Sequence, residues 1–357
     1  MRILNFVDSD ELSFRIPWLN LIHELERRGT EQAMLCWPGG NMERAAAEQG
    51  VPVHTWRPFT SKVPALCLGY PRLVRSISPD IVLTKLSSAA AIAGFWGRRL
   101  GIPTIATFDK EAKVKYYRNA DHYISCSKWI RDLMVSAGIP PDRIDVVHNS
   151  VDVGRYRRDD AAGKKLRESL GIGGNERVFA GVGRFDAEKS FDVLIRAFSE
   201  VAAVRPDVRL MLVGDGPLRG DYVRQVDALG LARLVVMSDG FVDDVRPWLW
   251  GADYYVMPSR MEPFGIAMLE AMASGLPAIA SDSGGLREIL TDGENGFMAR
   301  PGDPSSFAEA MIRVLDMDGD YIGGIVSCSL QRLSYFTSEA LASRLTDVFE
   351  RVLGRLQ

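Results

Sequence analysis

The 357-residue sequence has few cysteines and no long apolar run, and each absence excludes a class of protein. The four cysteines (Cys36, Cys67, Cys126 and Cys328) form no CxxC pair, so neither a thiolate metal site nor a dithiol redox motif is indicated. Scattered cysteines in a chain of this length favour a reducing, cytoplasmic setting. No stretch of about 18 uninterrupted apolar residues occurs, and the first residues lack the pattern of a signal peptide. We therefore expect a cytoplasmic protein without a metal site, peripheral at most on the inner face of the membrane.

The sequence also lacks a strong net charge. Its 43 Lys and Arg residues and 46 Asp and Glu residues give a formal charge of −3, so no nucleic-acid partner is expected. The charge is uneven, however, because residues 1–155 contain 20 basic and 16 acidic side chains. This asymmetry fits either different partners for two domains or an ordinary solvated surface.

Repeats and low-complexity tracts are missing as well, and short apolar runs instead alternate with amphipathic segments. This alternation begins at Arg2–Val7 and restarts at Arg177–Val182. Between them, the polar, glycine-containing segment 151–175 is interpreted as a linker region with one helix. Strand–helix alternation at this spacing predicts parallel α/β sheets. We expect two tandem, doubly wound, Rossmann-like domains at residues 1–155 and 156–335. A last helix at 336–357 can pack back on the first domain.

The first candidate binding motif follows an apolar strand and precedes a helix. It reads Gly181-Val-Gly183-Arg184-Phe-Asp-Ala-Glu-Lys189. Glycines allow a turn to approach a ligand closely, and an arginine fork with a lysine point charge suits a diphosphate. The same residues also fit an ordinary turn with two solvated bases. A second turn, around Gly214 in VGDGPL, has the same two interpretations.

The third motif is the most informative. It runs from Pro258 to Pro277 as PSRMEPFGIAMLEAMASGLP and carries Glu262 and Glu270 in an E-x7-E pattern. Glu270 lies inside an otherwise apolar helix and needs a partner, for which the hydroxyls of a polyol are suitable. The N–H groups at Gly265 and Ile266 begin that helix and can bind an anion. The alternative is that Glu270 forms a salt bridge with a neighbouring side chain.

Together these motifs resemble the retaining glycosyltransferases of family 4, which have the GT-B fold. The resemblance covers about residues 176–300 through GR-x4-K, VGDGP, DGFVDDV, the E-x7-E segment, SDSGGLREIL and DGENGF, and IDVVHNSVD at 144–152 is similar to the family's domain junction. The resemblance implies two Rossmann-like domains that face each other across a cleft. It also implies transfer of a sugar from a nucleoside-diphosphate sugar, UDP- or GDP-linked, with retained configuration and without a catalytic metal or other cofactor.

The resemblance also assigns roles to residues of this chain. Arg184 and Lys189 would hold the donor diphosphate and stabilise the leaving charge, Glu262 would contact the donor sugar, and Glu270 would bind the ribose hydroxyls. Gly183, Gly214, Phe264, Gly265 and Ile266 would bring backbone close to the donor, and the backbone at Phe241 and Val242 would meet the base.

The first domain departs from the family pattern at two places. The loop after its first strand, 8–15, has no glycine, and Asp109 stands where many members have a histidine. Asp109 could contact the acceptor or a sugar hydroxyl, or it could be a helix N-cap. Among the four histidines, His148 at the domain junction could face the cleft, whereas the others fit surface or core positions.

The segment Lys110–Arg118 combines lysines, tyrosines and arginine. Such a composition suits an anionic membrane surface, although a solvated loop explains it equally well. The resemblance implies a saccharide or lipid-linked acceptor, and because lipid-linked acceptors are common in similar enzymes, this segment could make peripheral membrane contact. By analogy, we expect a role in cell-surface polysaccharide or lipopolysaccharide synthesis.

Three other functions compete with this reading. A GT-B sugar-nucleotide epimerase would turn over donor without acceptor, and a degenerate transferase would bind sugar nucleotide without reaction. A hydride-transfer enzyme is disfavoured, because no GxGxxG follows the first strand of either domain.

Overall fold

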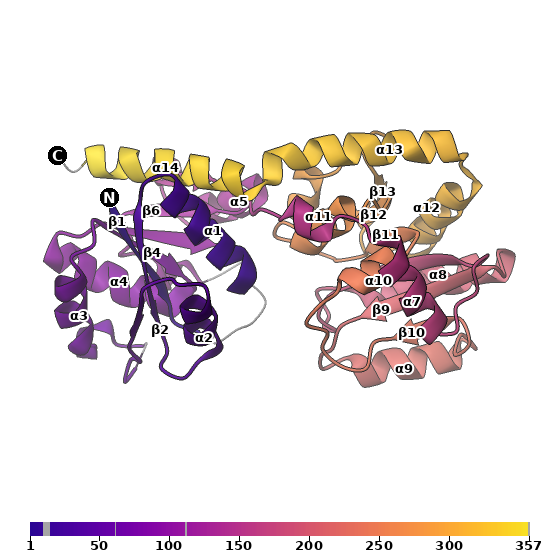
Figure 1. The fold of residues 1–357 in the computed structure, drawn as a ribbon, viewed down its shortest axis with the longest axis horizontal. Helices are drawn as coiled ribbons and strands as arrows, with labels where there is room; N and C mark the ends of the chain where they lie inside the picture. The colour runs from indigo at the N-terminus through magenta and orange to yellow at the C-terminus, as the bar shows by residue number, and fades with distance from the viewer. Residues whose placement is uncertain (10–14, 61, 111–112, 356–357) are drawn as a thin grey trace. The chain divides into compact units, whose positions relative to one another are not determined.

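The structure of the chain is a computed structural model that describes residues 1–9, 15–60, 62–110 and 113–355, the side chain of Arg15 excepted. The chain forms two compact units. Unit 1 comprises residues 1–150 and 338–357, and unit 2 comprises residues 151–337. In each unit, helices cover a sheet whose described strands pair in parallel (Figure 1).

Unit 1 contains a seven-stranded sheet in the order β3-β2-β1-β4-β5-β6-β7. Its strands are β1 (Arg2–Val7), β2 (Glu31–Cys36), β3 (Val53–Thr55), β4 (Ile81–Lys85), β5 (Thr104–Phe108), β6 (His122–Ser125) and β7 (Ile144–Val146). Most of their residues are buried, as expected for a sheet that is covered on both faces.

The helices of unit 1 lie on both faces of this sheet. They are α1 (Arg15–Arg27), α2 (Asn41–Glu48), α3 (Gly69–Ile77), α4 (Ser87–Leu100), α5 (Lys128–Ser136) and α14 (Ser338–Gly354), with short 3-10 turns η1 (Pro64–Leu66), η2 (Val114–Tyr116) and η3 (Pro141–Arg143). One core cluster joins α1, α2 and α14 to the sheet, and another joins α3 and α4 to it. The C-terminal helix α14 therefore packs on unit 1.

Unit 2 contains a six-stranded sheet in the order β10-β9-β8-β11-β12-β13. Its strands are β8 (Arg177–Val182), β9 (Val208–Val213), β10 (Val235–Met237), β11 (Tyr254–Met257), β12 (Ala278–Ser281) and β13 (Phe297–Ala299). Its helices and 3-10 turns are α6 (Val153–Tyr156), α7 (Asp160–Ser169), α8 (Phe191–Val204), α9 (Arg219–Ala228), α10 (Arg246–Trp250), α11 (Ile266–Ala273), η4 (Gly284–Glu288), α12 (Pro304–Asp316), α13 (Gly319–Arg332) and η5 (Leu333–Phe336).

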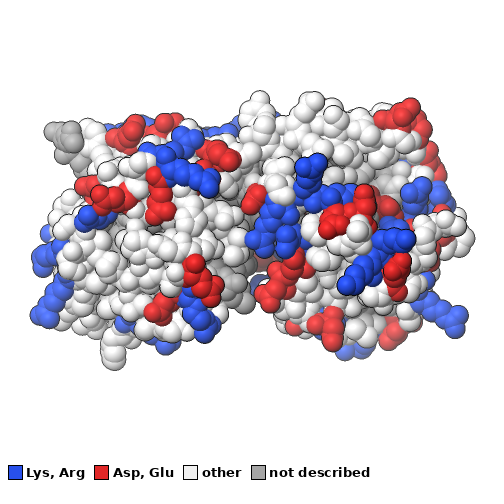
Figure 2. All heavy atoms as spheres, in the orientation of Figure 1, with Lys and Arg blue, Asp and Glu red and all other residues white. Residues whose placement is uncertain are grey.

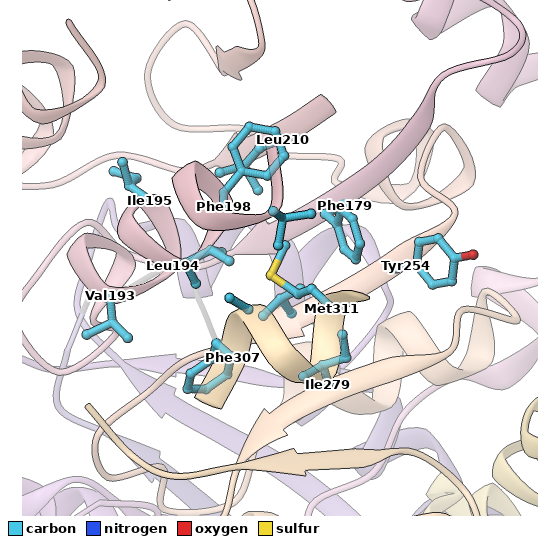
Figure 3. Packing of buried hydrophobic residues seen from close by; sticks show 14 of the residues in the cluster. Phe179, Val193, Leu194, Ile195, Phe198, Leu210, Tyr254, Ile279, Phe307 and Met311 are labelled. Carbon is cyan, nitrogen blue, oxygen red and sulfur yellow. The ribbon is translucent and has the colours of Figure 1, made fainter. Parts of the chain in front are cut away.

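A core cluster of unit 2 lies where α8 and α12 pack against the sheet (Figure 3). Phe198 of α8 and Met311 of α12 are fully buried among side chains of the strands. The rings of Phe179 and Tyr254, from neighbouring strands, stack with their centroids 5.0 Å apart. This packing fixes β8 and β11 side by side.

The segment at 151–175 was expected to be a linker but packs within unit 2. Helix α7 lies so close to α10 that a Cβ on Gly163 would stand 2.3 Å from the carbonyl oxygen of Trp250. The indole Nε1 of Trp250 donates to the carbonyl of Tyr156 in α6 at 3.1 Å. Unit 2 thus begins at Val151, a few residues before the boundary expected from the sequence. Helices α5 and α13 have no counterpart among the predicted elements.

The strand order places a topological switch point in each sheet. In unit 2 the chain leaves β8 toward β9 on one side and returns to β11 on the other, and in unit 1 β1 lies between β2 and β4. In open parallel sheets, ligands bind outside the carboxyl ends of the strands at such a point. Within the described residues, no helix has the length and apolar character required to cross a bilayer.

Candidate active site

Two glycine-containing turns meet at the carboxyl ends of β8 and β9. The N–H of Gly183 donates to the carbonyl of Val213 at 3.0 Å. Gly214 has φ +143°, and a Cβ there would lie 2.0 Å from the carbonyl oxygen of Gly183. These glycines were expected to let the backbone approach a ligand. In the structure their first effect is to let the two turns touch each other.

Arg184 projects from the turn after β8. Its Nε donates to Oδ2 of Asp186 at 2.6 Å, while 69% of the arginine side chain stays exposed. The other oxygen of Asp186 accepts the backbone N–H groups of Glu188 and Lys189 at 3.1 and 3.2 Å. Asp186 therefore shapes the loop and orients a guanidinium that remains open to solvent.

Lys189 and Glu262 form an ion pair across the switch point. The Nζ of Lys189, which follows β8, lies 2.6 Å from Oε2 of Glu262, which follows the neighbouring strand β11. The hydroxyl of Ser259 donates to the same oxygen at 3.1 Å. Glu262 is only 7% exposed, and neither bond uses its Oε1. A lysine and a carboxylate that the sequence separates by 73 positions are thus brought together.

The loop after β11 is held in place by the first residues of η4. The carbonyl of Glu262 accepts the N–H of Gly285 at 2.9 Å, and a Cβ on Gly284 would lie 2.3 Å from that carbonyl oxygen. Gly265 follows with φ +112° as the N-cap of α11, a conformation that favours glycine. Phe264 is buried, with its ring centroid 5.6 Å from that of Phe336. The first N–H groups of α11, at Gly265 and Ile266, are thereby held at the carboxyl edge of the sheet, next to Glu262.

Glu270 lies on α11, and the partner that its carboxyl group was expected to need is the hydroxyl of Tyr156. The hydroxyl of Tyr156 donates to Oε1 of Glu270 at 2.6 Å. Burial raises the pKa of the Glu270 carboxyl to about 7, although the Tyr156 hydrogen bond and the nearby Arg155 charge both lower it. The partner is therefore a neutral hydroxyl rather than the salt bridge considered as the alternative. Tyr156 could not be found from the sequence, because it lies in the segment interpreted as a linker.

Phe241 and Val242 follow β10 at the same edge of the sheet. Phe241 is 62% exposed, which leaves an aromatic face open to solvent, and Val242 is half-buried. Their loop is tied to the β9 turn through Ser238, whose hydroxyl accepts the N–H of Gly214 at 2.9 Å. The predicted residues of the second domain thus lie on loops at the carboxyl ends of β8, β9, β10 and β11, or on the helix that follows.

Asp109 lies at the corresponding edge of unit 1. Its carboxylate forms an ion pair with Lys85, and the lysine side chain is 8% exposed with its Nζ 4.9 Å from the centroid of the Trp18 ring. Asp109 therefore binds Lys85 and caps none of the described helices. Sequence reasoning missed Lys85, although a lysine that ends the apolar run IVLTK was a usable signal.

The histidines other than His148 have little catalytic character. His122 is buried and its Nε2 lies 2.7 Å from Oδ2 of Asp145, and burial lowers the pKa of the imidazole. His23 contacts Glu26 and Gln49 through its two ring nitrogens. Across the described part of the chain, no group of three or more His, Cys, Asp or Glu side chains could hold a metal ion. On the face shown in Figure 2, basic and acidic side chains are interspersed on both units.

Comparison with known families gives two matches along the chain. Residues 18–155 match the model for Glycosyltransferase Family 4, and residues 176–317 match that for Glycosyl transferases group 1. The matches fall one in each unit and together span most of the chain.

Comparison with individual proteins agrees. The chain is 28% identical to the lipopolysaccharide core biosynthesis glycosyltransferase LpsE of Rhizobium meliloti over 301 residues, and this match covers 84% of each protein. It is 30% identical over 236 residues to D-inositol 3-phosphate glycosyltransferase of Thermobispora bispora, covering 63% of this chain but only 54% of that protein.

Solved structures share the fold. Anabaena HepE in complex with UDP-glucose superposes with a TM-score of 0.84 at 22% identity, covering 98% of this chain and all of the other. At this identity the likeness shows the architecture of two parallel-sheet α/β domains, the GT-B fold, and not the substrate.

Proposed function

The chain carries both domains of glycosyltransferase family 4 and belongs to that family, and from this premise we propose that it is a retaining transferase. It takes a sugar from a nucleoside-diphosphate sugar and gives it to a saccharide or lipid-linked acceptor. The observation that carries the proposal is the Lys189–Glu262 pair at the switch point of unit 2, with Arg184 exposed on the adjoining turn.

Arg184 and Lys189 supply two cations on the loop after β8, and Lys189 contacts Glu262 in the loop that leads into α11. A diphosphate placed there would have its charge neutralised by Arg184, Lys189 and the helix start. These groups favour the charge that develops when the bond between the anomeric carbon and the phosphate oxygen breaks. The acceptor hydroxyl then bonds to the same face of the sugar, and its proton passes to the departing phosphate oxygen. No metal and no covalent enzyme intermediate is required in this scheme.

Glu262 and Glu270 divide the recognition of the donor between them. The bonds of Glu262 to Lys189 and Ser259 both use Oε2, so its Oε1 can accept a hydrogen bond from a hydroxyl of the donor sugar. Glu270 accepts hydrogen bonds from the ribose hydroxyls, while its Oε1 accepts the hydrogen bond from the Tyr156 hydroxyl. Phe241 offers its exposed ring beside the position of the base. Anabaena HepE, which shares the fold, was crystallised with UDP-glucose, so UDP-glucose is the first donor to test.

The acceptor belongs to unit 1. Lys85 and Asp109 lie at the carboxyl ends of β4 and β5 and offer a donor and an acceptor of hydrogen bonds for a sugar. Synthesis of a cell-surface polysaccharide or lipopolysaccharide is the proposed setting, supported by the similarity to the lipopolysaccharide core biosynthesis glycosyltransferase of Rhizobium meliloti.

The test measures thermal stability with UDP, GDP, ADP, CMP and their sugars in the presence of EDTA. A ligand at about 100 times its dissociation constant stabilises a protein by about 2.7 kcal/mol, so the correct nucleotide gives a clear shift. Arg184→Ala should retain the fold, since its side chain is mostly exposed, and should slow transfer by about a hundredfold or more. Near-full activity of that variant would make the assignment of the donor site wrong.

Two alternatives have their own signatures. Turnover of the donor into an epimer without acceptor would identify an epimerase. Nucleotide binding without any transfer, over a panel of saccharide and lipid-linked acceptors, would identify a binding protein.

A further inference from the structure

An apolar loop of unit 1 faces solvent between β3 and α3. Phe59 exposes 93% of its surface and Leu68 65%, and Val63 and Leu66 are also exposed. Clustered apolar side chains of this size in water mark an interaction site. The neighbouring Tyr70 is fully buried, so the exposed side chains belong to a segment that is anchored in the core.

The loop is held in place by α4. The indole Nε1 of Trp96 donates to the carbonyl of Pro64 at 2.9 Å, which fixes η1 against the helix. The Sγ of Cys67 donates to the carbonyl of Thr60 at 3.2 Å and closes the loop on itself. The exposed apolar side chains therefore lie on a loop whose backbone is held by hydrogen bonds from Trp96 and Cys67.

The chain segments that form and adjoin this loop are basic. Residues 57–79 and 86–108 contain no Asp or Glu. The basic residues of these stretches and of the basic–aromatic segment 110–118 are Arg57, Lys62, Arg72, Arg75, Arg98, Arg99, Lys110, Lys113, Lys115 and Arg118. Considering only partners that the structure describes, none of these ten residues forms an ion pair. Within the described residues, no carboxylate therefore pairs with this charge; the one acidic residue of 110–118, Glu111, lies outside them.

The helices on the opposite face of the same sheet differ. Those helices, α1, α2 and α14, carry the acidic residues Glu24, Glu26, Glu43, Glu48, Glu339, Asp347 and Glu350. Several of their basic side chains are paired, as in Arg27–Glu24 and Arg351–Asp145. The excess positive charge of the first half of the chain is thus concentrated on one face of unit 1.

Helix α4 joins the apolar loop to the basic–aromatic segment. Trp96 bonds to η1, and two residues later Arg98 donates to the carbonyl of Arg118 at 3.2 Å. In the segment, Tyr116 is 37% exposed and the Nζ of Lys115 lies 5.0 Å from its ring centroid. Residues 111–112 lie outside the described residues. The apolar loop, α4 and the described residues 113–118 form one surface, here called the α4 surface.

We propose that the α4 surface docks unit 1 on an anionic lipid bilayer. Phe59 and Leu68 would enter the acyl region, while the lysines and arginines contact lipid phosphates. A second copy of this chain is a poorer occupant, because it would place two equally cationic surfaces against each other. The apolar loop and the basic–aromatic segment start after β3 and β5, at the sheet edge where Lys85 and Asp109 lie, and extend along α4 to Trp96 and Arg98 near its C-terminal end. The delivery of a lipid-linked acceptor to that edge rests on the proposed function, whereas docking itself does not.

The experiment is co-sedimentation of the full chain with vesicles of phosphatidylglycerol and phosphatidylcholine in equal parts, and with phosphatidylcholine alone. Binding is expected only to the anionic vesicles and should weaken in high salt. Phe59→Ser should weaken binding by about tenfold, since one phenylalanine leaves the apolar phase. The double variant Lys113→Ser with Lys115→Ser should weaken it by roughly tenfold or more, from two lost contacts with the lipid surface.

Matched controls come from unit 2. Val204→Ser removes an apolar side chain that is 62% exposed on α8, and Lys164→Ser with Lys165→Ser removes two exposed lysines of α7. Both controls should bind vesicles as the unchanged chain does. No binding of the unchanged chain to anionic vesicles at low salt would overturn the proposal, as would unchanged binding of Phe59→Ser.

Self-association is a separate outcome. A dimer that dissociates in Phe59→Ser, without vesicle binding by the unchanged chain, would assign the α4 surface to a second copy and overturn bilayer docking. The thermal shift by UDP is measured on the same samples. Its absence would contradict the proposed function while leaving the vesicle result to decide docking.

Discussion

Replacing Tyr156 by phenylalanine tests how the carboxyl of Glu270 is held. The variant keeps the ring and removes the hydroxyl that donates to Oε1 at 2.6 Å. A hydrogen bond to a charged group contributes about 1.5–3 kcal/mol, which corresponds to roughly one to two pKa units. The pKa of Glu270, about 7 in the unchanged chain, should therefore rise in the variant by that amount.

The consequence is a pH-dependent loss of nucleotide affinity. If the ionised carboxylate binds the ribose, roughly half of the unchanged protein is competent at neutral pH, against about a tenth or less of the variant. The affinity for UDP should then fall by roughly five- to fiftyfold near neutral pH, and most of the gap should close near pH 9. Isothermal titration with UDP across this range measures both, and 2′-deoxy-UDP serves as the matched ligand with one hydroxyl fewer.

Two results would refute this reasoning. A loss of affinity that is the same at every pH would mean that Tyr156 acts by packing rather than on the ionisation of Glu270. An equal effect of Tyr156→Phe on UDP and on 2′-deoxy-UDP would detach the 2′-hydroxyl from the contact with Glu270.

Three further predictions concern stability. The pKa of Glu270 in the folded chain lies above its ordinary value of 4.5, so the ligand-free chain should lose stability as the pH rises from about 4.5 through about 7. Glu270→Gln should remove up to a few kcal/mol of this loss, measured by urea unfolding at pH 8. A variant that is no more stable than the unchanged chain at pH 8 would contradict burial as the cause of the raised pKa. Gly214→Ala should destabilise the chain by about 1–3 kcal/mol, because the new Cβ would meet the carbonyl of Gly183. Gly230→Ala should cost less, because the space there is open and only the positive φ is strained. Equal costs would show that the two turns can separate freely. The effects of Lys189→Ala and Glu262→Ala on the free energy of unfolding should be non-additive in a double-mutant cycle by about 0.5–3 kcal/mol. Additivity would show that the ion pair contributes nothing to stability.

Local patterns were sufficient for most of the fold. Buried strands such as Arg2–Val7 and Arg177–Val182 were predicted at their observed bounds, because an apolar run between polar turns has little freedom to be anything else. Helix α13 was missed, since Gly319, Gly323 and Gly324 weaken its helical pattern and its stability comes from packing. The segment 151–175 was misread because it has few apolar residues, and those such as Leu166 find their packing partners only where α7 meets α10.

The sequence by itself determined the chemistry available at the site. Arginine, lysine and two glutamates stand at fixed spacings after strands or on the following helix, and parallel strands bring their carboxyl ends to one edge. The tertiary structure alone decided the partners: Lys189 with Glu262, Tyr156 with Glu270, and Lys85 with Asp109. These pairs join residues from separate elements, and their contacts depend on strand order and helix packing, which the spacing of residues along the chain does not encode.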